Sequence, residues 1–323
     1  MRVLERRDVE RLLDMESCIG AVEDAFRARG QGRRAPSGIL GLDLDGGTLH
    51  AKLGSLNLSR AYAAAKINAN FPDNSARHDL PTIQGVLLLF DAAIGTPLAS
   101  MDSGLITAMR TAAATAVAAR YLALPHASSA TFIGCGIQAR AHLEAIHHVR
   151  RIEHVVAFDL NYAAAERFAG EARARFDVVA EVVSDVRQAA GASEIVITST
   201  PSRQALLNPG DLAAGTFVAA VGADNEGKQE IAADLLRQVM VVVDDLDQCS
   251  RIGDLHHALA LGAMPPGHVV VSLDQIVAGL APGRSNGDEI IVFDSTGVAI
   301  EDVAAAALVY ERAEKTGAGF VIT

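Results

Sequence analysis

The chain has 323 residues, of which 50% are hydrophobic, so it is long enough to bury the cores of two domains. Its 39 acidic residues outnumber 28 lysines and arginines, and with a net charge of −11 and no basic cluster we expect no nucleic-acid partner. The sequence contains no run of about 18 apolar residues that would span a membrane, and no apolar signal segment near Met1, so we expect a cytoplasmic protein.

The first part of the chain is typical of an α+β domain. Residues 8–30 carry apolar side chains at helical spacing and predict one amphipathic helix that stops at Gly30. Residues 104–124 predict an alanine-rich helix that leads into a second domain. Between these helices, short apolar runs separated by Gly, Asn and Pro predict a largely antiparallel sheet with strands at 38–44, 48–52, 63–68 and 82–91.

From Thr131 onward, strand and helix patterns alternate, which is the pattern of a doubly wound parallel sheet. The final helix, 299–315, is amphipathic and is expected to pack back on the first domain. We therefore predict an α/β protein with a substrate and dimerisation domain at 1–118 and 299–323, and a Rossmann domain at 119–298. The predicted strands are 131–134, 154–159, 179–183, 194–199, 216–221, 240–244 and 290–293, and the helices between them are 137–149, 162–174, 185–190 and 232–237.

The strand that begins near Thr131 ends in a G-x-G-x-x-A motif formed by Gly134, Gly136 and Ala139. Gly134 permits a tight turn, Gly136 lets the backbone approach a pyrophosphate, and Ala139 keeps the following helix close to the strand. The helix N-terminus adds unpaired N–H groups and a partial positive charge. This motif predicts a dinucleotide site, whereas the alternative is a glycine turn in another kind of α/β unit.

Asp159 strengthens the dinucleotide interpretation, because it ends the next strand 23 positions after Gly136. An acid at this position accepts hydrogen bonds from the adenosine ribose and repels a 2′-phosphate. No basic residue follows in 160–163, so we expect NAD(H) to be preferred over NADP(H). The cysteines are three and far apart, so we expect no disulfide framework and no cysteine-based zinc site, and we predict no metal.

Three charged residues are candidates for the chemistry. Lys66 lies on an apolar strand, so its ammonium either reaches the edge of the sheet or faces a site. Arg110 precedes an alanine run, and its guanidinium either binds a carboxylate in a bidentate manner or pairs with an acid on the helix surface. Asp224 follows the strand at 216–221, where it either exchanges a proton with a ligand or caps the turn.

These motifs, taken in order, resemble the ornithine cyclodeaminase/mu-crystallin family, which includes archaeal-type alanine dehydrogenases and imine reductases. The resemblance covers nearly the whole chain and implies a homodimer, with the first half forming the subunit interface and part of the active site. It also implies a Rossmann domain that binds NAD(H) or NADP(H). The matching segments are 65–68 with Pro72 and Asn74, 80–82, 109–113, 133–139, 222–230, 243–245 and 293–297.

The resemblance assigns roles to individual residues. It implies that Lys66 and Arg110 lie beside the substrate carboxylate, that Lys66 also lies near the substrate nitrogen, and that Asp224 is the acid–base group. We therefore predict Lys66 and Asp224 as catalytic residues. The expected cofactor-binding residues are Arg110, Thr111, Gly134, Gly136, Ile137, Gln138, Asp159, Thr198, Ser199, Thr200, Val221, Gly222, Ser295 and Thr296.

The chain departs from the family at one point. Many relatives have an arginine two residues after a proline near position 36, where it helps to hold the substrate carboxylate, but here Pro36 is followed by Ser37 and Gly38. The cations nearest in sequence are Arg33, Arg34 and Lys52. Lys52 lies in a predicted strand, and we hypothesise that it contacts the same ligand.

Three functions are compatible with these residues and with the resemblance. The first is hydride transfer between NAD(H) and the α-carbon of a small amino acid or its imino or 2-oxo acid. The second is cyclodeamination of ornithine to proline with loss of ammonia, in which NAD is reduced and reoxidised within one turnover. The third is a cofactor-holding binding protein of the mu-crystallin kind. Two features favour the first: the chain lacks the C-terminal extension of many cyclodeaminases, and 240–248 and 291–309 look most similar to archaeal alanine dehydrogenases.

Overall fold

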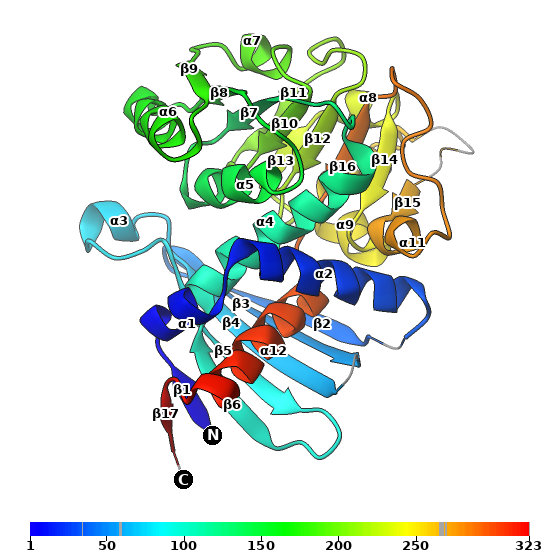
Figure 1. Ribbon diagram of the computed structural model, residues 1–323. Helices are drawn as coiled ribbons and strands as arrows, with labels where there is room; N and C mark the ends of the chain where they lie inside the picture. The colour runs from blue at the N-terminus through cyan, green and yellow to red at the C-terminus, as the bar shows by residue number, and fades with distance from the viewer. Residues whose placement is uncertain (34, 58–59, 265–267, 269, 323) are drawn as a thin grey trace. The chain divides into compact units, whose positions relative to one another are not determined.

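The computed structural model describes residues 1–33, 35–57, 60–264, 268 and 270–322. The chain forms two compact units, one of Met1–Arg110 with Val298–Thr323 and one of Thr111–Gly297 (Figure 1). The first boundary lies inside helix α4 (Ser103–Leu122), earlier than the position 118/119 expected from the sequence. Within the described ranges, no helix is long and apolar enough to cross a membrane.

The first unit is built on a seven-stranded sheet with the order β17-β1-β6-β5-β4-β3-β2. Strands β2 to β5 pair antiparallel in sequence order, as the sequence predicts, and β6, which it does not predict, pairs antiparallel with β5. β1 joins β6 in parallel, which makes the sheet mixed. The strands are β1 (Arg2–Leu4), β2 (Ser37–Leu44), β3 (Gly47–Asn57), β4 (Ala61–Asn70), β5 (Ile83–Asp91), β6 (Pro97–Asp102) and β17 (Phe320–Val321), with a short helix α3 (Asn74–Arg77) between β4 and β5.

The single N-terminal helix predicted over residues 8–30 is wrong. The chain forms α1 (Arg6–Leu12) and α2 (Met15–Gly30), and Leu13 between them has an extended backbone with φ −121° and ψ 106°. The Asp14 side chain accepts a hydrogen bond from the Ser17 N–H and so caps α2. Helical spacing of the apolar residues continues across the break, because both helices turn an apolar face to the same core, and this hides the break in the sequence pattern.

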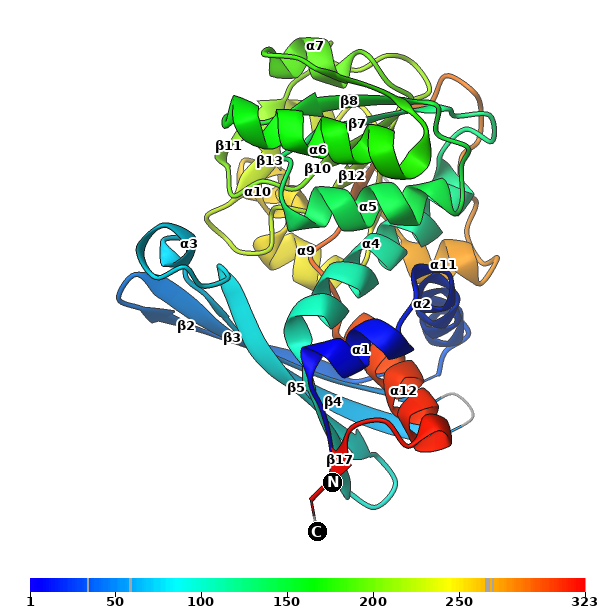
Figure 2. The same ribbon diagram turned by 60° about the vertical axis from the view of Figure 1, so that its left-hand side comes forward.

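Helix α12 (Ala299–Thr316) covers one face of this sheet and packs on β3 and β4, with α2 beside it (Figure 2). Along β4 the side chains of Tyr62, Ala64 and Lys66 are buried beneath the helix, and the intervening residues point to the other face. The approach is close at Gly54 of β3, where a Cβ would lie 2.6 Å from the Cβ of Ala299. This glycine allows the first turn of α12 to lie directly on the sheet.

The second unit contains an eight-stranded parallel sheet with the order β15-β14-β16-β12-β10-β7-β8-β9, so the predicted α/β class with a doubly wound sheet is confirmed. Its central strands are apolar and buried, as expected for a sheet covered on both faces. The strands are β7 (Ser129–Ile133), β8 (His154–Phe158), β9 (Val179–Val182), β10 (Ile195–Thr198), β12 (Phe217–Ala220), β14 (Met240–Val243), β15 (Val270–Ser272) and β16 (Ile291–Asp294).

Helices connect these strands, and the sequence predicted four of them: α5 (Ile137–His147), α6 (Tyr162–Phe176), α7 (Val186–Ala190) and α8 (Ala233–Leu236). The elements missed by the sequence patterns are short, because few residues carry too little periodicity for a prediction. In this unit they are the paired strands β11 (Arg203–Leu207) and β13 (Gln229–Ile231), the strand β15, and the helices α9 (Leu246–Ile252), α10 (Asp254–Ala260) and α11 (Leu273–Val277).

Candidate active site

The glycine motif forms the turn between β7 and α5. Gly134 has φ 91°, and a Cβ there would lie 2.8 Å from the carbonyl oxygen of Ser199, so this position requires glycine. Gly136 caps α5 without a side chain, is exposed, and would meet no atom within 4 Å if it carried a Cβ. An open helix N-terminus that lacks a side-chain cap fits a pyrophosphate group.

Asp159 follows β8 and contacts this same turn. Its Oδ2 accepts a hydrogen bond from the Cys135 N–H at 2.8 Å, and its Oδ1 accepts one from the Asn161 N–H at 2.8 Å. A carboxylate has further lone pairs, so these bonds leave Asp159 able to accept a ribose hydroxyl. Burial, together with the nearby Asp159, raises the pKa of the Cys135 thiol to about 12, which fits a packing role for this cysteine.

The loops that follow β10 and β12 are held by one buried acid, Glu230, which the sequence did not single out. Its Oε2 accepts hydrogen bonds from the Thr198 hydroxyl and the Gly222 N–H, both at 2.7 Å. Its Oε1 accepts bonds from the N–H and the hydroxyl of Thr200, also at 2.7 Å. Burial raises the pKa of Glu230, while these donors favour its charged form. The hydroxyls of Thr198 and Thr200 thus serve to fix the two loops.

The turn after β16 is held in a similar way by the buried carboxylate of Asp244. It accepts hydrogen bonds from the Thr296 hydroxyl at 3.0 Å, the Gly297 N–H at 2.6 Å and the Ser295 hydroxyl at 3.4 Å. Ser295 and Thr296 are each 2% exposed. Their contact with a nicotinamide stays a prediction. The predicted contacts of four further residues with the cofactor also stay predictions: Ile137 is exposed, Gln138 is partly buried, and Thr111 and Val221 are buried.

Asp224 lies beyond β12 and keeps a carboxylate that solvent reaches. Its Oδ1 accepts a hydrogen bond from the Lys228 ammonium at 2.7 Å, and the Asp224 side chain is 45% exposed. Its backbone N–H bonds the carbonyl of Gly222 within the turn. The side chain is therefore paired but accessible to solvent, and its acid–base role stays a prediction.

In the first unit, the structure brings together Lys66 and Arg110, the two cations predicted from the sequence. Lys66 on β4 is 3% exposed, and Arg110 on α4 is 4% exposed. Both contact the same oxygen, Oδ1 of Asp302, at 2.8 Å from Lys66 Nζ and 2.9 Å from Arg110 Nε. Arg110 also donates from Nη1 to Oε2 of Glu301 at 2.7 Å.

Glu301 and Asp302 were missed by the sequence analysis. They form the first turn of α12, where every residue from Ala299 to Ala307 is buried. Two consecutive acids inside a run of buried apolar residues were a usable signal, because buried carboxylates are rare unless they are paired. The partners, however, lie almost two hundred residues or more away in the chain.

The electrostatics of this cluster favour binding of an anion. Burial lowers the pKa of Lys66 to about 7, and the nearby Arg110 and Lys52 act in the same direction against the attraction of Asp302. Burial also raises the pKa of Asp302, but Arg110 and Lys66 outweigh this and lower it overall. The neighbouring Arg110 and Lys52 thus place Lys66 in a positive potential, which a bound anion would offset.

Lys52 and Arg33 are the described cations nearest in sequence to the position of the absent family arginine. Lys52 is half-buried, whereas Arg33 makes an exposed contact. Lys52 on β3 is paired directly with Lys66 in the β3–β4 ladder and is half-buried. Arg33 donates to the carbonyl of Asn57 at 3.3 Å in an exposed contact. Arg34 lies outside the described residues. Of the two described cations, Lys52 is the one that lies beside Lys66.

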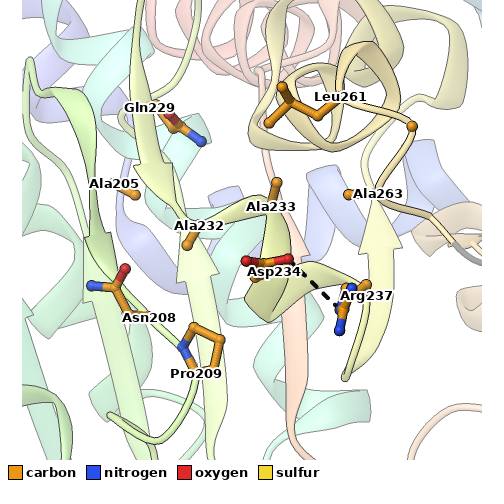
Figure 3. A pocket seen from close by; sticks show the side chains of 11 residues that line it. Ala205, Asn208, Pro209, Gln229, Ala232, Ala233, Asp234, Arg237, Leu261 and Ala263 are labelled. Carbon is orange, nitrogen blue, oxygen red and sulfur yellow. Dashed lines mark ion pairs between the residues drawn. The ribbon is translucent and has the colours of Figure 1, made fainter.

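The second unit contains a cavity of about 520 Å³ (Figure 3). It is lined by Asn208, Gln229, several alanines and an ion pair between Asp234 and Arg237 at 3.7 Å. None of the residues predicted for the site lines this cavity. In the described part of the chain, no three His, Cys, Asp or Glu side chains are arranged to hold a metal ion.

Known enzymes resemble this chain over almost its full length. Alanine dehydrogenase of Archaeoglobus fulgidus is 36% identical over 319 residues, which cover 98% of this chain and 96% of that enzyme. Iminosuccinate reductase of Paracoccus denitrificans is 31% identical over 319 residues, covering 98% of each chain.

Solved structures share the fold. An archaeal alanine dehydrogenase dimer with bound NAD has a TM-score of 0.94 at 36% identity, covering 100% of this chain and 99% of its own. The Δ1-pyrroline-2-carboxylate reductase of Thermococcus litoralis, in complex with NADH and L-proline, has a TM-score of 0.94 at 34% identity and full coverage of both chains. Residues 1–317 match the ornithine cyclodeaminase/mu-crystallin family. The chain belongs to this family, as the sequence motifs predict.

Proposed function

We propose that this protein is a nicotinamide-dependent oxidoreductase that transfers a hydride between the cofactor and the α-carbon of a small amino or imino acid. The observation that carries the proposal is the buried cluster in which Lys66 and Arg110 lie together around one oxygen of Asp302. Arg110 and Lys52 act as positive charges on Lys66, and such surroundings suit a substrate carboxylate. The relatives support the same chemistry, because they are an alanine dehydrogenase and two reductases of imino acids.

The second unit would hold the cofactor. The Gly134 and Gly136 turn and the N-terminus of α5 suit the pyrophosphate, and Asp159 suits the adenosine ribose. The nicotinamide, when bound, supplies or accepts the hydride. We further propose that NAD(H) is preferred over NADP(H), because the Asp159 carboxylate would repel a 2′-phosphate, and the similar structures contain NAD and NADH.

Protein side chains would orient the substrate. Lys66 and Arg110 would bind its carboxylate through charge-assisted hydrogen bonds, and Lys52 would contribute in place of the absent arginine. An arriving carboxylate also favours the charged form of Lys66. Asp224, with its exposed carboxylate beside Lys228, would exchange a proton with the substrate nitrogen.

We propose that the protein is a homodimer formed through the open face of the first unit's sheet. This face is apolar and exposed at Leu40, Leu42, Leu53 and Ile67, with exposures of 61%, 51%, 51% and 37%. Contiguous exposed apolar surface marks an interaction site, and a similar structure is a dimer.

The cytoplasmic location stays a prediction. Fractionation of cells that produce the protein tests it.

A substrate panel read at the nicotinamide absorbance band tests the function. The panel contains pyruvate with ammonia, Δ1-pyrroline-2-carboxylate, iminosuccinate and ornithine, each with NADH or NAD. We expect oxidation of NADH in step with one of the first three compounds. Conversion of ornithine to proline without net absorbance change would identify a cyclodeaminase instead. Binding of cofactor with no turnover of any compound would contradict the proposal and favour a binding protein.

A further inference from the structure

Asp302 lies at the centre of the buried charge cluster. One of its oxygens, Oδ1, contacts both Lys66 Nζ at 2.8 Å and Arg110 Nε at 2.9 Å. The other, Oδ2, is buried and has no hydrogen-bond partner among the residues that the structure describes. The side chain of Asp302 is 3% exposed, so this oxygen is shielded from bulk solvent.

The backbone of α12 fixes the position of Asp302. The close approach of Ala299 to Gly54 places the first turn of the helix on β3, and the residues that follow are buried against the sheet. A carboxylate at this place has little freedom to move away from Lys66. The geometry of the cluster is therefore set by packing and not only by attraction between the charges.

Among the described residues, charged groups on three elements act on Lys66. Arg110 approaches from α4, Asp302 from α12, and Lys52 from β3, while its β5 neighbour in the ladder is the apolar Leu87. Glu301 contacts Arg110. On α2, the Cys18 thiol lies near Glu301 and Arg110, and burial raises its pKa to about 12, so it adds no charge near neutral pH. Asp302 is thus the anion in direct contact with Lys66.

Stability does not explain this arrangement. Buried ion pairs are frequently no more stabilising than apolar side chains of the same volume. Here a buried carboxylate oxygen of Asp302 without a hydrogen-bond partner among the described residues adds a further cost. Costs of this kind are typical of functional sites.

We propose that Asp302 is a positioning residue of the substrate site, which holds the Lys66 ammonium and the Arg110 guanidinium in place and keeps Lys66 charged for a substrate carboxylate. The proposal rests on the function proposed above, in which these two cations bind that carboxylate. Without the Asp302 anion, burial, Arg110 and Lys52 would all favour the neutral amine of Lys66. A neutral amine binds a carboxylate weakly. As pH rises, affinity for the carboxylate would therefore begin to fall at a lower pH than in the wild type.

The titration of Lys66 tests the proposal independently of activity. The chain has only four lysines, Lys52, Lys66, Lys228 and Lys315, so lysine labelled with 13C at the ε-carbon gives an NMR spectrum that single substitutions can assign. In the wild type we expect Lys66 to titrate near pH 7. In D302N its midpoint should fall by about one to three pH units.

E311Q is the matched control, because Glu311 lies on the same helix and accepts a hydrogen bond from Tyr62 instead of a cation of the cluster. It should leave the Lys66 titration unchanged. D302S removes the same charge with a smaller side chain and replaces D302N if that variant does not fold. An unchanged Lys66 midpoint in a folded variant overturns the proposal, and so does loss of folding in both variants while E311Q folds.

Binding of L-proline and L-alanine in the presence of NADH, followed by calorimetry at pH 6, 7 and 8, separates this proposal from the proposed function. We expect D302N to bind them at least about tenfold more weakly than the wild type at pH 7, and to recover part of this loss at pH 6. A shifted Lys66 titration with unchanged binding would support the electrostatic role of Asp302 but contradict the carboxylate-binding role of Lys66.

Discussion

Single carboxylates in this protein each organise several hydrogen-bond donors or cations. Asp159 is a clear case, because both of its carboxylate oxygens bond backbone N–H groups and one of these groups belongs to the glycine turn. The acid therefore fixes the turn, and its proposed second task is to accept the ribose. Glu230 and Asp302 follow the same rule in different surroundings, since each carboxylate organises several donors at once.

The first prediction concerns cofactor choice. Asp159→Ser removes the negative charge and keeps one acceptor for the Cys135 N–H. The ratio of kcat/KM for NADH to that for NADPH should fall at least about tenfold, because the repulsion of a 2′-phosphate is lost. Asp234→Ser, an exposed aspartate of the same unit, should leave the ratio unchanged. An unaltered ratio in Asp159→Ser would contradict the assignment of Asp159 to the ribose.

At the scale of elements, two helices depend on contacts that their own sequence does not reveal. The break between α1 and α2 is stabilised by Asp14, which caps α2 and also pairs with Arg312 of α12 at 2.7 Å. The other helix is α12, whose first turn reaches the sheet only because Gly54 lacks a side chain. The Asp14–Arg312 pair and the approach of Ala299 to Gly54 each join distant parts of the chain.

The second prediction concerns Asp14→Ala. Loss of the cap should lower the free energy of unfolding by about 1 kcal/mol, measured with urea at pH 7. Burial raises the pKa of Asp14, but the Ser17 N–H and Arg312 outweigh it and lower the value to about 2. The group is more acidic when folded, so its contribution is present above the unfolded pKa of 3.8 and disappears as pH falls toward 2.

The same urea titration repeated between pH 2 and 5 follows this loss. The difference between wild type and Asp14→Ala should shrink toward the lower end of that range. Asp24→Ala on the same helix is the control, because Asp24 pairs with Arg27 at the surface and caps nothing. Equal losses of stability at pH 7 in both variants would refute the capping role.

The third prediction concerns Gly54→Ala. The new Cβ would lie 2.6 Å from the Cβ of Ala299, so α12 must shift, at a cost of about 1–3 kcal/mol in the free energy of unfolding. The shift should also move Asp302 and raise the KM for the substrate carboxylate. Gly20→Ala in α2 is the control, since no atom lies within 4 Å of its added Cβ, and it should be as stable as the wild type or more so.

At the scale of the whole molecule, the chain divides its tasks between two units. The first, which contains both termini, carries the charge cluster and an apolar sheet face, and the second carries the glycine turn and Asp159. The final helix returns to the first unit and supplies Glu301 and Asp302. The first unit is therefore assembled from two separate segments of the chain.

The fourth prediction concerns assembly. Leu42→Lys places a charge on the open apolar face of the sheet and should convert a dimer into a monomer of 33.8 kDa in sedimentation equilibrium. Ile94→Lys changes a still more exposed apolar residue in the turn between β5 and β6 and should remain dimeric. A dimer that survives Leu42→Lys would place the interface elsewhere.

Local features of the sequence determined much of this protein. The alternation of strands and helices, the glycine turn and the acid at the end of β8 all arise from residues within about thirty positions, where periodicity and turn chemistry report directly on the backbone. Lys66 and Arg110 were identifiable because each charge stands among apolar neighbours. These features were sufficient for the α/β class and the family, and they carry the prediction of the dinucleotide site.

Only the tertiary structure decided which groups hold these charges. Asp302 contacts Lys66 across 236 positions of the chain, Glu230 joins the loops after β10 and β12, and Asp14 pairs with Arg312 across 298 positions. The partner of a buried charge is chosen by the packing of whole elements, and no local pattern encodes that choice. The sequence thus identified the cations Lys66 and Arg110 of the buried cluster, and the fold supplied the anions that pair with them.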